Sequence, residues 1–158
     1  MPILILKTMI NAPIERCFDL SRNIDLHAQS MQHSGEKAIA GKTDGLISLD
    51  ESVTWRAKHF GLNFTMTNKI TAMEHPHFFI DEMTKGPFKK LSHQHLFKTI
   101  GTQTEMSDIF QFEAPYGILG RLVEQLFLTS YMEKLLMHRN EVVKREAQRR
   151  IAPPTPLP

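Results

Sequence analysis

The sequence predicts an α+β fold in which a curved antiparallel sheet packs against one long C-terminal helix. Strand-like segments follow one another from residue 36 to residue 112 with only short turns between them, as in a β-meander. Two short helical segments separate a first strand from this meander. A segment rich in Leu, Glu, Lys and Arg follows it over residues 117–148. One long amphipathic helix is sufficient to cover the apolar face of a meander.

The first elements are indicated by residue type and by turn signals. Residues 3–11 are β-rich and end before Pro13, which can serve as the first residue of a helix. PIERCFDLSRN then spaces its apolar residues as a helix does, and NIDLHAQSM offers a second short helix that begins at Asn23 or Asp25. The order is therefore β, α, α.

The meander is predicted from runs of β-branched and aromatic residues between turn signals. Its expected strands are residues 36–40, 49–59, 62–73, 77–84 and 91–112, the last broken by a turn at Gly101-Thr102.

The long helix carries two apolar faces rather than one. Its first half places Leu119, Leu122, Val123, Leu126 and Phe127 on one side, and its second half places Met132, Leu135, Leu136 and Val143 on another. The apolar face therefore shifts around the axis near Thr129-Ser130, as expected of a helix that crosses a strongly curved sheet.

Two-residue turns set the register of two hairpins. A turn at Gly101-Thr102 pairs residues whose numbers sum to 203. A turn at Phe60-Gly61 sets Trp55 opposite Met66 and Ala57 opposite Phe64. The first hairpin then has four pairs on its inward face: Phe97 with Met106, His95 with Asp108, His93 with Phe110, and Leu91 with Phe112. An apolar wall with a few polar groups is typical of a small-molecule site.

Three roles remain open for His93, His95 and Asp108. His95 and Asp108 can form a buried structural pair, or they can read the polar end of a ligand. A metal would need a third protein ligand, and the register supplies only Asp108, so no metal site is predicted. The remaining histidines share no spacing and are interpreted as surface or turn residues: His27, His33, His59, His75, His77 and His138.

Composition excludes several classes of function. The formal net charge of +2 is too small to indicate a nucleic-acid partner. The apolar start MPILILKTMI lacks the features of a secretion signal, and no segment approaches the ~18 apolar residues of a membrane span. Cys17 is the only cysteine, which excludes an intrachain disulfide and fits a reducing compartment. We expect a cytoplasmic protein that is a monomer or a weak homodimer.

The length of 158 residues favours one domain, expected over residues 1–148. The ending IAPPTPLP predicts a disordered, proline-rich tail over residues 149–158.

Several segments together carry a family resemblance. INAPIERCFDL, FFIDEMTKGPFKKLSHQHLF and MSDIFQFEAPYGILGRLVEQLFL resemble the SRPBCC superfamily, the START-like and birch-pollen-allergen-like group, over about residues 3–147. The similarity is greatest to its small bacterial ligand-binding subfamily, which is largely uncharacterised. The most specific parts are Gly86-Pro87-Phe88, His93-x-His95-x-Phe97, Asp108 and Pro115-x-Gly117.

The resemblance implies a helix-grip fold: a seven-stranded curved antiparallel sheet around the long helix, with an apolar cavity between them. Periodicity alone does not orient the strand at residues 77–84, because Phe78, Phe79 and Ile80 are all apolar. The resemblance implies that Phe79 and Asp81 point inward together, which would bring a second carboxylate near His93.

We predict binding or transport of a hydrophobic small molecule of lipid, polyketide or aromatic type, with no cofactor. The alternative is a polyketide-cyclase-like or dehydratase enzyme in which His95 is the general base, Asp108 orients it and His93 polarises a carbonyl. A third hypothesis is protein contact through the basic helix end or the tail. The predicted ligand-binding residues are Trp55, Phe64, Met66, Phe79, Asp81, His93, His95, Phe97, Met106, Asp108 and Phe110.

Overall fold

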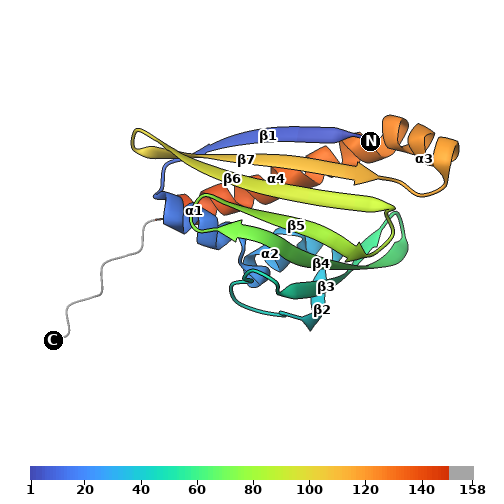
Figure 1. Cartoon of the computed structure of the whole chain (residues 1–158), viewed down its shortest axis with the longest axis horizontal. Helices are drawn as coiled ribbons and strands as arrows, with labels where there is room; N and C mark the ends of the chain where they lie inside the picture. The colour runs from blue at the N-terminus through green and yellow to red at the C-terminus, as the bar shows by residue number, and fades with distance from the viewer. Residues whose placement is uncertain (150–158) are drawn as a thin grey trace.

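One antiparallel sheet of seven strands wraps around a long helix in the computed structural model, which describes residues 1–149 (Figure 1). The α+β helix-grip fold predicted from the sequence is confirmed. Apart from Arg149, the predicted tail at residues 149–158 lies outside the described residues. The strands are β1 (Ile3–Ile10), β2 (Lys37–Gly41), β3 (Ser52–His59), β4 (Leu62–Glu74), β5 (Phe78–Lys85), β6 (Lys90–Ile100) and β7 (Gln103–Glu113).

Two short helices follow β1, as predicted. They are α1 (Ile14–Ser21) and α2 (Ile24–Ser30), and a 3-10 turn at Gln32–Ser34 leads into β2. Asn23 is the residue that caps α2, because its side-chain oxygen accepts a hydrogen bond of 2.9 Å from the Leu26 N–H. Within residues 1–149, no helix combines the length and the apolar composition needed to cross a bilayer.

The strand order across the sheet is β1-β7-β6-β5-β4-β3-β2. The meander therefore runs from β2 to β7, and β1 returns to pair with β7 at the far edge. The register predicted from both turns is confirmed, with His95 opposite Asp108 and Trp55 opposite Met66. Gly101 adopts a φ of 60°, a left-handed conformation that glycine reaches without the steric cost of a side chain.

The long helix is divided by a π-helical turn, Glu124–Leu128, between α3 (Gly117–Val123) and α4 (Thr129–Gln148). A π turn adds one residue to the helical repeat and rotates the side chains of the next turns about the axis. This explains the shift of the apolar face, which the sequence had indicated near Thr129-Ser130. The apolar side chains before the shift are largely exposed, with Leu119 at 66% and Phe127 at 65%. Figure 1 shows why: α3 lies beyond one end of the sheet, and only α4 crosses it.

Helix α1 holds the other end of α4. Arg16 donates hydrogen bonds to the carbonyl oxygens of Ala147 and Glu146, at 2.8 and 2.9 Å, which satisfies two carbonyls at the helix terminus. Phe18 inserts fully buried between α1 and the sheet, against Phe79 and Phe97. Apolar packing thus closes this end of the sheet and leaves the middle of α4 facing the concave surface.

Candidate functional site

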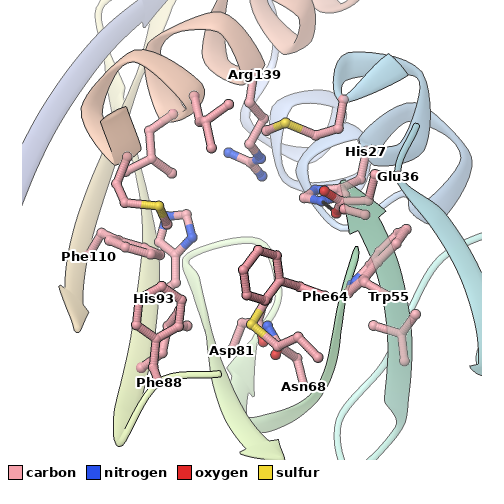
Figure 2. Close-up of a pocket in the computed structure, with 18 of the residues that line it drawn as sticks. His27, Glu36, Trp55, Phe64, Asn68, Asp81, Phe88, His93, Phe110 and Arg139 are labelled. Atoms are coloured by element: carbon pink, nitrogen blue, oxygen red, sulfur yellow. Dashed lines mark hydrogen bonds and ion pairs between the residues drawn. The ribbon is translucent and has the colours of Figure 1, made fainter. Parts of the chain in front are cut away.

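A cavity of about 400 Å³ lies between the concave face of the sheet and helices α2 and α4 (Figure 2). Its wall is mainly apolar, and aromatic side chains come from strands β3, β4, β5 and β7 and from the turn between β5 and β6. These are Trp55, Phe64, Phe79, Phe88 and Phe110. Helix α4 contributes Met132, Leu135 and Leu136 from the opposite side.

Eight of the eleven predicted ligand-binding residues line this cavity. They are Trp55, Phe64, Met66, Phe79, Asp81, His93, His95 and Phe110. Asp81 and Phe79 therefore share the inward face of β5, as the family resemblance implied.

Three predicted residues face inward but do not line the cavity: Phe97, Met106 and Asp108. Phe97 and Met106 belong to the core cluster that also contains Phe18, because α1 covers the sheet at their end of the hairpin. Asp108 is fully buried behind the two histidines. Strand periodicity gives the face of a residue but not its position along the sheet, so it does not separate cavity from core.

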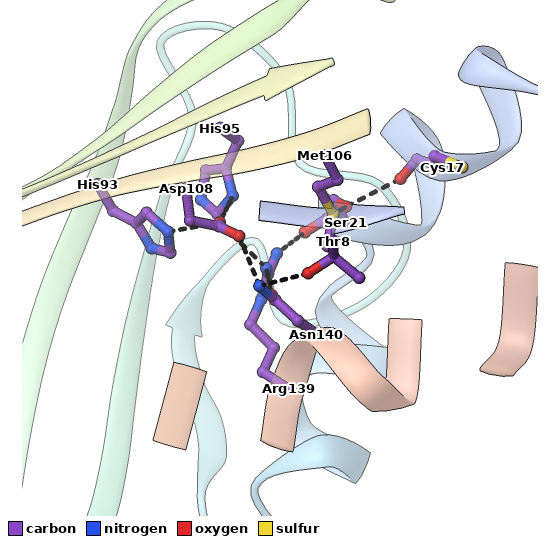
Figure 3. Close-up of polar contacts among 9 residues, drawn as sticks. All are labelled: Thr8, Cys17, Ser21, His93, His95, Met106, Asp108, Arg139 and Asn140. Carbon is purple, nitrogen blue, oxygen red and sulfur yellow. Dashed lines mark hydrogen bonds and ion pairs between the residues drawn. The ribbon is translucent and has the colours of Figure 1, made fainter. Parts of the chain in front are cut away.

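Asp108 is the centre of a buried polar network (Figure 3). Its Oδ1 accepts a hydrogen bond of 2.8 Å from His93 Nε2, and its Oδ2 accepts one of 2.7 Å from Asn140 Nδ2. Nη1 of Arg139 lies 3.6 Å from Oδ1 and provides a positive charge. His93 thus makes the hydrogen bond to Asp108, whereas the sequence analysis had considered His95 as the partner of this carboxylate.

His95 sits between two rings. Its imidazole stacks on Phe79 at 4.2 Å and lies 3.7 Å from the ring of His93, measured between centroids. Nδ1 of His95 is 3.1 Å from Asp108 Oδ1, yet this nitrogen is not aligned for a hydrogen bond and has no partner within residues 1–149. Stacking therefore fixes the ring beside the carboxylate without making it a second donor.

Arg139 connects the network to the cavity. This side chain of α4 is only 3% exposed, and it donates hydrogen bonds to the Ser21 carbonyl at 2.9 Å and to Asn140 Oδ1 at 3.0 Å. A buried guanidinium needs an anionic partner, and Asp108 is the nearest. Arg139 also lines the cavity, so the network presents a cation at the wall.

The network shifts the pKa values of its members in the directions expected from this geometry. Burial opposes ionisation of Asp108, but the hydrogen bond from His93 and the proximity of His95 hold its pKa well below the ordinary 3.8. Burial, His93 and Arg139 together hold the pKa of His95 well below 6.5. The folded protein thus keeps Asp108 ionised and His95 neutral.

We expect His95 to make the protein less stable in acid. Because the pKa of His95 is lower in the folded chain than in the unfolded chain, the unfolded chain binds the proton first as pH falls below 6.5. One such proton changes the free energy of unfolding by at most about 1.4 kcal/mol per pH unit. Urea unfolding between pH 7 and pH 5 should show a shallower loss of stability for His95→Gln than for the natural protein.

The exposed His77 provides the matched control for this measurement. His77→Gln should keep the pH slope of the natural protein. Because burial raises the pKa of Asp81, protonation of this carboxyl favours the folded chain as pH falls, in the natural protein and in both variants alike. The measurement therefore compares the dependence of stability on pH among the three proteins. Equal slopes for His95→Gln and the natural protein would contradict the neutral state of His95.

His93, His95 and Asp108 also bring donor atoms within 4.8 Å of one another, a donor set that divalent ions use. However, the Asp108 oxygens accept hydrogen bonds from His93 and Asn140, and the Arg139 guanidinium already supplies a cation there. An ion would have to displace the His93 hydrogen bond and share the carboxylate with Arg139. The arrangement fits a hydrogen-bonded network better than a metal site.

Two histidines interpreted as surface residues in fact line the cavity. Nε2 of His27 is 2.7 Å from Glu36 Oε1, and the His27 ring packs 4.5 Å from the ring of Trp55. Nδ1 of His59 is 2.7 Å from the Tyr131 hydroxyl. Their positions depend on how α2 and α4 fold over the sheet, which spacing along the sequence does not reveal.

A further pair of polar side chains in the cavity is Asp81 on β5 and Asn68 on β4, which lie side by side below Phe64 in Figure 2. Oδ1 of each is buried and lacks a hydrogen-bond partner in the described part of the chain. Burial raises the pKa of the Asp81 carboxyl, and His93 and His27 act to lower it.

Sequence reasoning missed Asn68 and Arg139, although each carried a signal. Asn68 follows Met66 by two residues, so it shares the inward face of β4. Arg139 lies three residues after Leu136 and four before Val143, on the buried stripe of α4. Its place among the basic residues of the helix end, where cations are usual, hid this signal.

No protein-family model and no curated protein matches the sequence. Solved structures do match the fold. A protein of Thermus thermophilus has a TM-score of 0.71 at 17% identity, covering 92% of this chain and 99% of that one. The ginseng major latex-like protein 151 of Panax ginseng has a TM-score of 0.67 at 15% identity, over 94% and 98% of the two chains. A START superfamily protein of Mycobacterium smegmatis has a TM-score of 0.68 at 13% identity, over 92% and 96%. The chain therefore has the START-like helix-grip fold.

Proposed function

We propose that this helix-grip protein binds or carries a hydrophobic small molecule of lipid, polyketide or aromatic type in the cavity beneath α4. The observation that carries the proposal is the cavity itself, about 400 Å³ with an aromatic wall and few polar groups. Ligand sites commonly measure about 300–1,000 Å³ and combine apolar walls with a few placed polar groups. The START superfamily protein and the latex-like protein share the fold that forms this cavity.

Apolar burial would supply most of the affinity. Each 100 Å² of apolar ligand surface removed from water is worth about 2.5 kcal/mol. The polar groups of the wall would then select among apolar ligands by their hydrogen bonds, which are more discriminating where water is excluded.

The geometry supports binding more than the cyclase alternative. A general base at His95 would need a proton affinity near the working pH, whereas the pKa of this imidazole is held well below 6.5. The hydrogen bond expected to orient His95 goes from His93 to Asp108 instead.

We also propose that residues 1–148 are one domain, working in the cytoplasm as a monomer or a weak homodimer. Cys17, the only cysteine, is buried and free, which fits a reducing compartment.

The test is to fill the cavity with a larger side chain and to measure the affinity of a neutral fluorescent probe, 1-N-phenylnaphthylamine. Ala57 is buried on the inward face of β3 and lines the cavity. Ala57→Trp should weaken probe binding at least about tenfold, or roughly 1.4 kcal/mol, because the indole occupies the probe's volume. Fluorescence titration measures the affinity, and a thermal melt reports whether the variant is folded.

Lys58→Trp is the matched control, since it adds the same side chain to the exposed face of the same strand. It should bind the probe as the natural protein does. Leu135→Trp fills the cavity from α4 and serves as a second variant if Ala57→Trp does not fold. Probe binding that is absent from the natural protein, or equal in folded cavity-filling variants, would contradict the proposal.

A further inference from the structure

Two acceptor oxygens in the cavity wall have no donor. Oδ1 of Asn68 and Oδ1 of Asp81 are both buried without a hydrogen-bond partner among residues 1–149. Asn68 as a whole is only 5% exposed. Leaving a buried acceptor unsatisfied costs the full desolvation of that atom, so a pair of them at a cavity wall needs an explanation.

The three basic residues whose charges act on Asp81 already contact other groups. The charges of His93, His27 and Arg139 act on its carboxyl. His93 is hydrogen-bonded to Asp108, and Nε2 of His27 lies 2.7 Å from Glu36. Arg139 donates to the Ser21 carbonyl and to Asn140. The Asn68 side chain also hydrogen-bonds to the Asp81 carboxyl, yet Oδ1 of each residue stays without a partner among residues 1–149. Neither the three basic groups nor Asn68 therefore satisfies both oxygens, which leaves the cavity side as the source of a donor.

We propose that Asp81 and Asn68 form a subsite for the hydroxyl group of an otherwise apolar ligand. The inference rests on the proposed binding function and narrows its ligand class to hydroxylated hydrophobic molecules, phenols or alcohols. The hydroxyl hydrogen satisfies one of the two oxygens. The hydroxyl oxygen can also accept a hydrogen bond from Asp81 when that carboxyl is protonated.

The surroundings favour a neutral hydroxyl over an ammonium group. Arg139 lines the same cavity and places a positive charge on its wall. An ammonium would be repelled by this charge and would lose its hydration, which costs more than burying a hydroxyl. Burial also raises the pKa of Asp81, which weakens it as a fixed anion.

The residues beside the subsite are apolar and would contact the remainder of the ligand. Asn68 lies between Met66 and Ile70 on the inward face of β4, and Asp81 follows Phe79 on the inward face of β5. The pair is thus a polar point within an apolar wall, which fits one hydroxyl on a ring system better than a polyol.

The test compares two probes of the same size, 2-naphthol and 2-methylnaphthalene, by displacement of 1-N-phenylnaphthylamine. They differ by a hydroxyl in place of a methyl group, and the methyl compound is the more hydrophobic. The natural protein should nonetheless bind 2-naphthol at least about tenfold more tightly, since hydrogen-bonding sites reject analogues that lack the group. Asp81→Leu and Asn68→Leu should each remove this preference.

Glu82→Leu is the matched control, an acidic residue on the same strand that does not line the cavity. It should retain the preference of the natural protein. Asp81→Asn keeps an acceptor oxygen at the subsite and should retain most of the preference, which separates loss of hydrogen bonding from loss of packing.

Each outcome is decisive. If the natural protein binds 2-methylnaphthalene as tightly as 2-naphthol, Asp81 and Asn68 satisfy each other and the subsite is overturned, while the binding function stands. If neither probe nor the fluorophore binds, the proposed function fails and the subsite fails with it. If 2-(aminomethyl)naphthalene binds more tightly than 2-naphthol, the hydroxyl assignment is overturned in favour of a cation.

Discussion

Asp108→Ala is expected to destabilise the protein by about 3–5 kcal/mol, the usual cost of removing one partner from a buried ion pair. The carboxylate is fully buried and accepts hydrogen bonds from His93 and Asn140. Without it, the Arg139 guanidinium, 3% exposed, is left as a buried charge that has lost its nearest carboxylate. Urea unfolding at pH 7 measures the loss.

A double-mutant cycle separates the charge pair from packing. Asp108→Leu alone should be about as damaging as the alanine variant, and Arg139→Met alone should be damaging too. Together they should recover a large part of the lost stability, since an apolar pair can replace a buried ion pair with little net cost.

Ser107→Ala, on the outer face of the same strand, is the control and should change stability by no more than about 0.5 kcal/mol. Strict additivity of Asp108→Leu and Arg139→Met would show that the two side chains do not stabilise each other.

Phe97→Ala is expected to cost about 3–5 kcal/mol of stability, the typical loss for a phenylalanine removed from a core. Phe97 is 5% exposed and lies 5.3 Å from Phe18 and 6.2 Å from Phe79, measured between ring centroids. It does not line the cavity, so the affinity of the folded variant for 1-N-phenylnaphthylamine should stay within about twofold, under 0.5 kcal/mol. Denaturant unfolding and fluorescence titration measure the two effects.

Phe64→Ala should show the reverse pattern. Phe64 is half-buried and lines the cavity, so its loss removes an aromatic contact for the ligand at little cost to the core. We expect about 1 kcal/mol of lost stability and about a tenfold weaker probe affinity. Two variants that lower affinity equally would place Phe97 at the ligand and not in the core.

The sheet was predictable from the sequence because its rules are local. Strand alternation fixes which side chains share a face, and a two-residue turn fixes which residues pair. This is why His95 opposite Asp108 and Trp55 opposite Met66 could be placed from turn arithmetic alone. The direction of Asp81 required the family resemblance, because three apolar residues precede it.

The set of residues that line the cavity was less predictable, because it depends on contacts between segments that are distant in the sequence. Whether Phe97 meets ligand or core is decided by α1, some 80 residues earlier in the chain, which brings Phe18 over that end of the hairpin. Likewise, His27 reaches the cavity only because α2 folds over the concave face of the sheet. The π turn at Glu124–Leu128 has no comparable local signature, although the shift of the apolar face recorded its effect.

The position of β1 at the edge of the sheet has a consequence for biosynthesis. The six strands from β2 to β7 pair in the order in which they are made, so each new strand finds its partner beside it. β1 is made before all of them, yet it pairs with β7, the last strand to be made. Ile3 can pair only after Gln111 has been synthesised. A nascent chain therefore carries an unpaired apolar strand until β7 has left the ribosome, the kind of exposure that favours aggregation or chaperone binding. Helix α4 follows later still, so the cavity exists only once nearly the whole domain has been translated.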